Sequence, residues 1–370
     1  MSLRSRVALA AGLAAALVVS LSAGPASAAT PSAPSTVSVS RSSAGGYNIS
    51  WTGVSGATGY TIYRELPVRA DTDGHGWIVT GFTWSAYATV SSSTRSLRTS
   101  DLLTSEVNYD YMSGRWAVAA KNSSGTGAKK INTARCASAY FLSARGSGQN
   151  PSKPSENPTK YSSGMGDRGL RVYEDARVRL GLKRSQIQAN MVSYPAIAIG
   201  WRVADKFNYD TSMNIGATNV YNQVNNIVSH CSSAKIILFG YSQGAQAVGN
   251  GYAMLSSSAK KHVTQVHLFA DAKRNSADPN IYHRPIMQKG QNGIWGARAN
   301  FTGTTDVQQI MSWCWSSDDI CSKDSVPTTI HGSAYDCYED WAAEHIAARV
   351  RNIKWIPSAN ITHPSCSMKI

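Results

Sequence analysis

The sequence of 370 residues has no cysteine before Cys136 and contains neither a Cys-x-x-C nor a His-Glu-x-x-His motif. The missing spacings argue against a zinc site built from these residues, and we expect no metal and no organic cofactor. All six cysteines lie in the later part of the chain. In an exported protein this even number predicts three disulfides, for which fifteen connectivities are possible.

Acidic residues are also scarce, with 22 Asp and Glu against 36 Lys and Arg, which gives a formal net charge of +14. The basic residues are spread along the chain and form only short pairs such as Lys129-Lys130 and Lys260-Lys261. Such spacing is typical of a solvated surface, which can also favour adhesion to acidic polymers. No recognised motif accompanies the charge, so nucleic acid is not an expected partner.

Long hydrophobic runs are absent after the N-terminus. Arg4 and Arg6 precede the apolar residues 7–21, and a small-x-small cleavage sequence ends at Ala28. This pattern predicts a secretory signal peptide over residues 1–28, and the run is short for a membrane span. We therefore expect a secreted, extracellular monomer without a membrane span.

Residues 29–130 contain short alternating apolar stretches separated by Ser, Gly and Thr, a pattern typical of an all-β sandwich. Tyr47, Ile49 and Trp51 show this alternation, and residues 116–120 repeat it. With the Pro-Ser-Ala-Pro sequence before the first strand, the region resembles a fibronectin type III module. The resemblance implies no chemistry of its own, but a spacer or an appendage that binds a polymer or a cell-wall surface.

From residue 134 to residue 370 the pattern changes to alternating strands and helices. This alternation predicts a three-layer α/β/α domain around a central parallel sheet, with ligand chemistry at the carboxyl ends of the strands. The predicted strands cover residues 139–142, 191–194, 236–239 and 266–269, and the predicted helices cover residues 170–180, 217–228 and 338–345.

The strongest motif lies where the apolar strand at residues 236–239 breaks before a helix. Gly240-Tyr241-Ser242-Gln243-Gly244 matches the G-x-S-x-G nucleophile elbow, in which a Cβ atom at either glycine would collide with backbone. The elbow exposes Ser242 and aims the backbone N–H of Gln243 at a developing oxyanion. A purely structural Ser-Gly turn is the alternative interpretation of the motif.

A nucleophilic serine needs an imidazole to remove its proton and a carboxylate to orient that imidazole. In α/β hydrolases the acid and then the histidine follow the serine in the chain. Four histidines lie far enough downstream, at positions 283, 331, 345 and 363. His345 falls on an apolar helical face and is interpreted as a core residue, and His283 and His363 lie in loops that contain proline. His331 is preferred because it lies just before a helix.

The preferred acid is Asp318, which lies thirteen residues before His331 and is enclosed by Cys314 and Cys321. A cross-link over so short a loop would hold the carboxylate in a fixed position. Two other acids remain possible. Asp319 is adjacent and would point elsewhere, and Asp271 follows the strand after the elbow helix, where it could equally be a helix cap or a turn residue.

Taken together, these motifs resemble the cutinase family of serine esterases over residues 134–370. The resemblance rests on Ala144-Arg145-Gly146-Ser147, on the elbow, and on the Cys-x-x-x-Asp-x-x-Cys sequence followed by His331. It implies Ser242 as nucleophile, Asp318 as acid, His331 as base, and the backbone N–H groups of Ser147 and Gln243 as the oxyanion hole. It also implies Cys136–Cys231 and Cys314–Cys321 disulfides, which leave Cys337 and Cys366 for each other.

The sequence departs from the family pattern at two places. Phe269-Ala270-Asp271-Ala272 stands where the family has Phe-Gly-Asp-Pro, and the tyrosine after His331 lies four residues on, at Tyr335, instead of three. The resemblance implies a carboxylic ester hydrolase acting on cutin, other polyesters or lipids. Two alternatives remain open: an acetylxylan esterase acting on plant polysaccharide, and a non-catalytic protein that binds a surface or a glycan.

Overall fold

The structure is a computed structural model that describes residues 29–41, 47–71, 77–99, 115–133, 136–147, 162–182, 187–198, 203–283, 291–323, 329–332 and 335–356. The expected signal peptide, His363 and Cys366 lie outside these residues. Within the described ranges, no helix has the length and apolar character that crossing a membrane requires.

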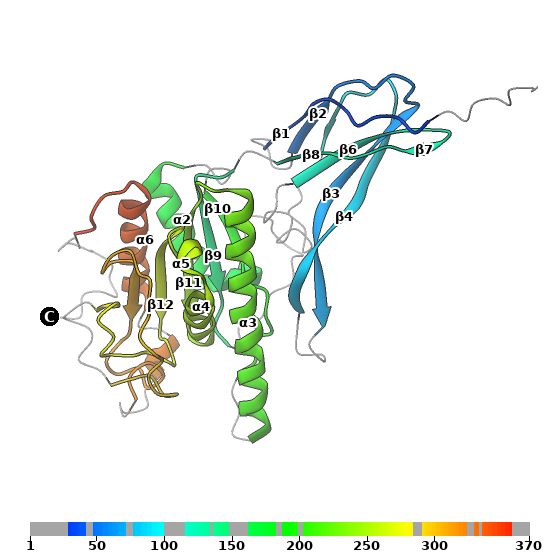
Figure 1. The fold of residues 1–370 in the computed structure, drawn as a ribbon. Helices are drawn as coiled ribbons and strands as arrows, with labels where there is room; N and C mark the ends of the chain where they lie inside the picture. The colour runs from blue at the N-terminus through cyan, green and yellow to red at the C-terminus, as the bar shows by residue number, and fades with distance from the viewer. Residues whose placement is uncertain are drawn as a thin grey trace, which may run out of the picture.

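The N-terminal part is built from two antiparallel sheets (Figure 1), as the alternating sequence pattern predicted. Between the sheets lies a core of alternating apolar side chains that includes Ile49, Trp51, Tyr60 and Trp116. One sheet has the order β1-β2-β5, with β1 at Val37–Arg41, β2 at Tyr47–Trp51 and β5 at Ser96–Arg98. The other has the order β4-β3-β6-β7, with β3 at Gly59–Asp71, β4 at Trp77–Ser91, β6 at Arg115–Asn122, β7 at Gly125–Thr126, and β8 at Lys130–Thr133 paired to β6.

Two strands of this region are longer than the short strands that the sequence predicted. β3 has 13 residues and β4 has 15, and they pair with each other along their whole length. The sequence around residues 71–80 is more polar and contains glycine, which hid these strand boundaries, but the ladder of backbone hydrogen bonds does not depend on side chains. The hairpin runs beyond the sandwich alongside the long helix α3 at Val203–His230 (Figure 1).

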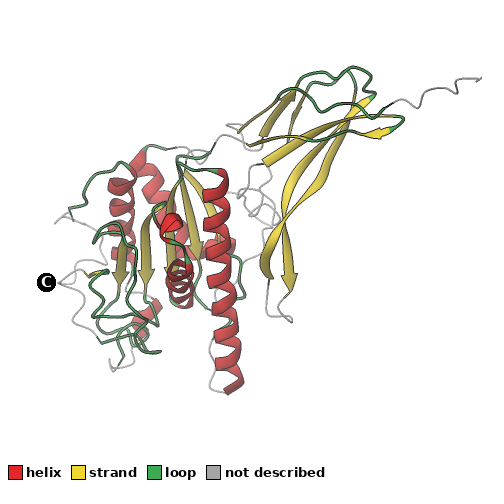
Figure 2. Cartoon of the chain, viewed as in Figure 1, coloured by secondary structure: helices red, strands yellow, loops and turns green. Residues whose placement is uncertain are grey.

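The C-terminal part is a parallel sheet with helices on both faces (Figure 2), which confirms the predicted α/β class. The strand order is β10-β9-β11-β12-β14-β13, and each neighbouring pair is parallel. The strands are β9 at Ala139–Ala144, β10 at Ile187–Met191, β11 at Lys235–Tyr241, β12 at Val263–Phe269, β13 at Tyr282–His283 and β14 at Ile310–Trp313. The helices besides α3 are α2 at Ser162–Leu180, α4 at Gln243–Met254, α5 at Ser257–Lys260, the 3-10 helix η1 at Thr329–Gly332 and α6 at Asp336–Val350.

The central strand β11 feeds two hydrophobic cores because successive side chains point to opposite faces of a sheet. Ile236 and Leu238 enter the core that α3 and α4 cover, whereas Ile237 and Phe239 enter the core that α2 and α6 cover. All four side chains are fully buried. This double burial explains the uninterrupted apolar run in the sequence.

One predicted boundary is wrong. The strand expected at residues 191–194 is β10 at Ile187–Met191 and ends where the expected strand begins. Val192 still donates a backbone hydrogen bond to Ser143 (2.8 Å) and is buried, so the apolar residues that suggested a strand belong to the extended segment that leaves the sheet. The polar residues Gln188 and Asn190 within β10 concealed it from the hydrophobic pattern.

Candidate active site

Ser242 occupies a strained turn between β11 and α4, at the carboxyl edge of the sheet. Its φ angle is +56°, which an L-residue adopts at a cost of roughly 1–3 kcal/mol. A Cβ atom on Gly240 would lie 2.4 Å from the Gly244 carbonyl oxygen, and one on Gly244 would lie 2.2 Å from that of Ala144. Both positions therefore require glycine, as the elbow motif predicted.

The three side chains selected from the sequence meet at this turn. His331 Nε2 lies 3.1 Å from Ser242 Oγ, and His331 Nδ1 lies 2.8 Å from Asp318 Oδ2. Asp318 is fully buried, while the imidazole is 28% exposed. With the proton on Nδ1 held by the carboxylate, Nε2 is the acceptor that faces the serine hydroxyl, which is the arrangement required for general-base activation.

The carboxylate of Asp318 is fixed from three directions. The Cys314–Cys321 disulfide closes its loop, with a Cα–Cα distance of 5.8 Å. The backbone N–H of Ile320 donates to Asp318 Oδ1 (3.0 Å), and the phenol of Tyr335 donates to Oδ2. Burial, together with the nearby Asp318, raises the pKa of Tyr335 well above its ordinary value, so the phenol remains a donor.

The loop that carries His331 is held by Tyr241 and Arg168. Tyr241 donates its hydroxyl to the His331 carbonyl oxygen (2.5 Å) and its ring stacks on the imidazole, with centroids 5.2 Å apart. Arg168 lies over the Tyr241 ring at 5.0 Å, donates to the Gly332 carbonyl and pairs with Glu339 (2.6 Å). These contacts hold the loop in the position where the imidazole faces Ser242.

The predicted oxyanion donors lie on adjoining segments. Gln243 is the first residue of α4, where backbone N–H groups have no acceptor within the helix. Ser147 follows β9 on a loop that packs against the elbow. The packing is close, since a Cβ atom on Gly244 would lie 2.4 Å from the Arg145 carbonyl oxygen. The Arg145 guanidinium anchors this loop by donating to the Tyr194 carbonyl (2.9 Å).

Comparison with known proteins identifies the C-terminal part. The model of the cutinase family matches residues 135–350, more than half of the chain. The chain belongs to the cutinase family. Cutinase CUT1 of Coprinopsis cinerea is 33% identical over 104 residues, which are 28% of this chain and 48% of that protein. Cutinase CUT2 of Pyricularia oryzae is 25% identical over 227 residues, 61% of this chain and 87% of that protein. The match thus spans about half the length of the first relative.

Solved structures resemble both parts of the chain. The catalytic core domain of acetyl xylan esterase from Trichoderma reesei is 18% identical with a TM-score of 0.43, covering 59% of this chain and 99% of that one. An Fn3-like protein from Clostridium thermocellum is 17% identical with a TM-score of 0.18, covering 30% of this chain and 97% of that one. The N-terminal β region thus resembles fibronectin type III structures, and it precedes a cutinase domain.

The rival site residues make other contacts in this cutinase-family domain. Asp271 forms a buried ion pair with Arg298, whose Nη2 lies 2.6 and 2.5 Å from the two carboxylate oxygens. Asp319 is half-buried beside Asp318, and the only carboxylate contact described for His331 is to Asp318. His345 is buried in the core, as its helical face predicted. The side chain of His283 is outside what the structure describes.

The cysteines form the disulfides that the family resemblance implied. Cys136 is bonded to Cys231 with a Cα–Cα distance of 5.8 Å, and Cys314 is bonded to Cys321. Cys337 is also disulfide-bonded, while its expected partner Cys366 lies outside the described residues. Among the described residues, no cluster of His, Cys, Asp and Glu has the arrangement of a metal site.

Sequence reasoning missed the roles of Arg168 and Tyr241. Arg168 lies on α2 and reaches α6 and the His331 loop across more than 160 positions of sequence, so no local pattern indicated it. Tyr241 was noted only as the variable residue of the elbow, although a ring next to the nucleophile is well placed to stack on the base. Ala270, which stands where the family pattern has glycine, has a φ of +52°, a conformation that strains an alanine more than a glycine.

Proposed function

We propose that this protein is a secreted serine carboxylic ester hydrolase. The proposal rests above all on one observation: Ser242 Oγ lies 3.1 Å from His331 Nε2, and the other ring nitrogen lies 2.8 Å from a buried carboxylate. This geometry gives a weakly nucleophilic alcohol a base that is held in the correct tautomer. Membership of the cutinase family and the strained elbow support the same reaction.

In the proposed reaction Ser242 attacks the ester carbonyl while His331 takes its proton. Asp318 stabilises the resulting imidazolium, and the backbone N–H groups of Ser147 and Gln243 bind the oxyanion. His331 then returns the proton to the departing alcohol. Water attacks the acyl-enzyme by the same route, with His331 again as base, and the carboxylic acid leaves with Ser242 restored. None of these steps needs a cofactor.

The proposed substrates are carboxylic esters, in polyesters, cutin, lipids or acetylated polysaccharides. Secretion is supported by the N-terminal sequence pattern and by the disulfides, which persist in oxidising compartments. The sandwich contributes none of the described residues that surround Ser242, and we propose that it holds an insoluble polymer. Co-sedimentation with cutin, xylan and cellulose, compared between the full-length Ser242→Ala chain and the same variant without residues 29–130, tests this role.

A test of the hydrolase itself compares the parent chain with Ser242→Ala on short-chain nitrophenyl esters. We expect the variant to lose at least ~1,000-fold in kcat, because the acyl-enzyme no longer forms. An alkyl phosphonate should label the parent once, at Ser242, as seen by peptide mass, and should leave Ser242→Ala unlabelled. Equal activity of the two proteins, or labelling at another residue, would contradict the proposal.

A further inference from the structure

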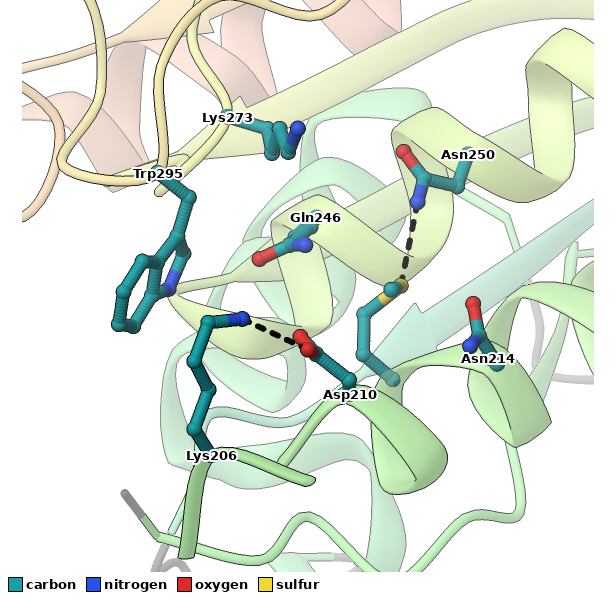
Figure 3. Close-up of a pocket in the computed structure, with 8 residues that line it drawn as sticks. Lys206, Asp210, Asn214, Gln246, Asn250, Lys273 and Trp295 are labelled. Carbon is teal, nitrogen blue, oxygen red and sulfur yellow. Dashed lines mark hydrogen bonds and ion pairs between the residues drawn. The ribbon is translucent and has the colours of Figure 1, made fainter. Parts of the chain in front are cut away.

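A cavity lies at the same edge of the sheet as Ser242, between α3, α4 and the loops after β12 (Figure 3). Its volume is about 420 Å³, which is within the range of ~300–1,000 Å³ typical of small-molecule sites. Gln246, in its wall, lies four residues after Ser242 on α4, roughly 6 Å along the helix axis. A molecule in the cavity would thus lie close to the ester that Ser242 attacks.

The lining of this cavity is unsuited to an acyl chain. Of the eight residues that line it, only Met213 and Trp295 are apolar, and the other six carry charged or amide groups. Burying an alkyl chain against such groups would desolvate them without replacing their hydrogen bonds. The chemistry of the wall instead suits a group that is rich in hydroxyls.

One wall of the cavity is formed by the indole of Trp295, next to an ion pair between Lys206 and Asp210. Lys206 Nζ lies 2.7 Å from Asp210 Oδ2 and 4.9 Å from the centroid of the Trp295 ring. Figure 3 shows these three side chains together on one side of the cavity. The two charges balance each other, and Lys206 and the Tyr209 ring, whose centroid lies 5.9 Å from that of Trp295, each contact part of the indole. This wall therefore presents the remaining aromatic surface and a carboxylate, with no net charge. Aromatic surfaces of this kind pack against the C–H faces of ring-shaped polar molecules.

The facing wall presents hydrogen-bond donors in fixed orientations. Gln246 is only 2% exposed, and its Oε1 accepts from Tyr209 (3.0 Å), which leaves Nε2 without an acceptor among the described residues. Asn250 Oδ1 accepts from Arg298 (2.7 Å) and Nδ2 donates one hydrogen to Met213 Sδ (3.1 Å), which leaves the second Nδ2 hydrogen for a ligand. Because both amide oxygens are occupied, the amide orientations are determined by the network. The Lys273 ammonium adds a third donor, with no carboxylate partner in the described part of the chain.

We propose that this cavity binds a sugar unit of an acylated saccharide, next to the unit whose ester Ser242 attacks. The sugar ring packs on Trp295, its oxygens accept hydrogen bonds from Gln246, Asn250 and Lys273, and a hydroxyl donates to Asp210. The inference rests on the proposed ester hydrolysis and names its substrate class. A site built to bond hydroxyls discriminates strongly against ligands that lack them.

The test compares acetylated xylo-oligosaccharides with 4-nitrophenyl acetate, which has no sugar to bind. The quantity compared is the ratio of kcat/KM on the oligosaccharide to kcat/KM on the nitrophenyl ester. We expect Trp295→Ala to lower this ratio at least ~10-fold, because the sugar loses one aromatic contact. Trp295→Phe keeps a ring and should recover much of the ratio. Phe207→Ala is the matched control, since Phe207 is 68% exposed on the same helix and does not line the cavity. It should leave the ratio unchanged.

A binding measurement separates this inference from the proposed function. Calorimetry with xylohexaose should show binding to Ser242→Ala that weakens at least ~10-fold when Trp295→Ala is added. A parent chain that cleaves nitrophenyl acetate, with an unchanged ratio in Trp295→Ala and no xylohexaose binding, would overturn the sugar site alone. A parent chain that cleaves no ester but still binds xylohexaose through Trp295 would overturn the hydrolase and support the sugar site.

Discussion

Asp271 and Asp318 both follow parallel strands at the same edge of the sheet and both are almost completely buried, yet their surroundings differ. Asp271 is clamped by Arg298, whose guanidinium charge is permanent. Asp318 faces His331, whose imidazole, unlike a guanidinium, carries no permanent charge. A permanent pair stabilises the fold but cannot respond to a reaction, whereas a carboxylate beside an imidazole can stabilise a charge that forms only during turnover. The partner, more than the position, decides which acid can be catalytic.

The largest expected effect comes from removing the charge that faces His331. Asp318→Asn should lower kcat by ~10,000-fold while the melting temperature changes little, because the amide favours the wrong imidazole tautomer and cannot stabilise imidazolium. Kinetics on a nitrophenyl ester measure this loss. Asp319→Asn is the matched control and should stay within about threefold of the parent. A loss of less than tenfold in Asp318→Asn would remove the distinction between the two buried acids.

The opposite result is expected at Asp271. Asp271→Asn leaves the buried guanidinium of Arg298 without its carboxylate, which should lower the free energy of unfolding by about 3–5 kcal/mol. Urea denaturation measures the change, and active-site titration with a phosphonate gives kcat for each folded molecule. That kcat should fall far less than in Asp318→Asn. If stability were unchanged, the view of Asp271 as a structural acid would be wrong.

The sequence predicted those features of the site whose residues lie close together in the chain. The elbow was readable because Gly240, Ser242 and Gly244 are separated by single residues and their steric requirement is local. Asp318 and His331 could be chosen because the close cysteines and the following helix mark their loops. The contacts of Arg168 and the ion pair of Asp271 join distant segments, so the sequence left Asp271 open as a rival. The two-residue strand β13 is too short for any periodic pattern.

A third buried group, on the α6 side of the sheet, is a pair of histidines. His267 and His345 contact each other, with Nε2 and Nδ1 3.3 Å apart, and Trp313 donates to His267 Nδ1 (3.1 Å). Burial, with the nearby Arg349, lowers the pKa of His345 to about 3, and burial beside His345 lowers the pKa of His267 well below 6.5. Among the described residues, neither imidazole has an ion pair with a carboxylate.

This pair predicts a loss of stability in acid. The unfolded state binds protons below pH ~6.5 and the folded state does not, so stability is complete above that pH and falls as the pH drops toward 3. For His345 alone the slope approaches about 1.4 kcal/mol per pH unit, or roughly 2–3 kcal/mol at pH 4.5. His345→Leu should reduce the slope of the unfolding free energy against pH by about 1.4 kcal/mol per pH unit. Urea denaturation at pH 4.5, 5.5 and 7 measures this slope. An unchanged slope would show that His345 is protonated in the fold.

The smallest expected effect concerns the phenol of Tyr335, a neutral donor that the described residues supply to Asp318 but not to Asp271. Tyr335→Phe removes the hydrogen bond to Asp318 Oδ2, the oxygen that also faces His331. The carboxylate then attracts the imidazolium more strongly, so the acidic limb of the kcat/KM profile should move to higher pH, with a loss of about tenfold in kcat/KM from looser positioning. Tyr338→Phe, whose ring centroid lies 5.5 Å from that of Tyr335, is the matched control and should leave the limb in place. A loss of activity without movement of the limb would mean that Tyr335 only packs against Asp318. The contact with His331 alone would then distinguish Asp318, the proposed catalytic acid, from Asp271.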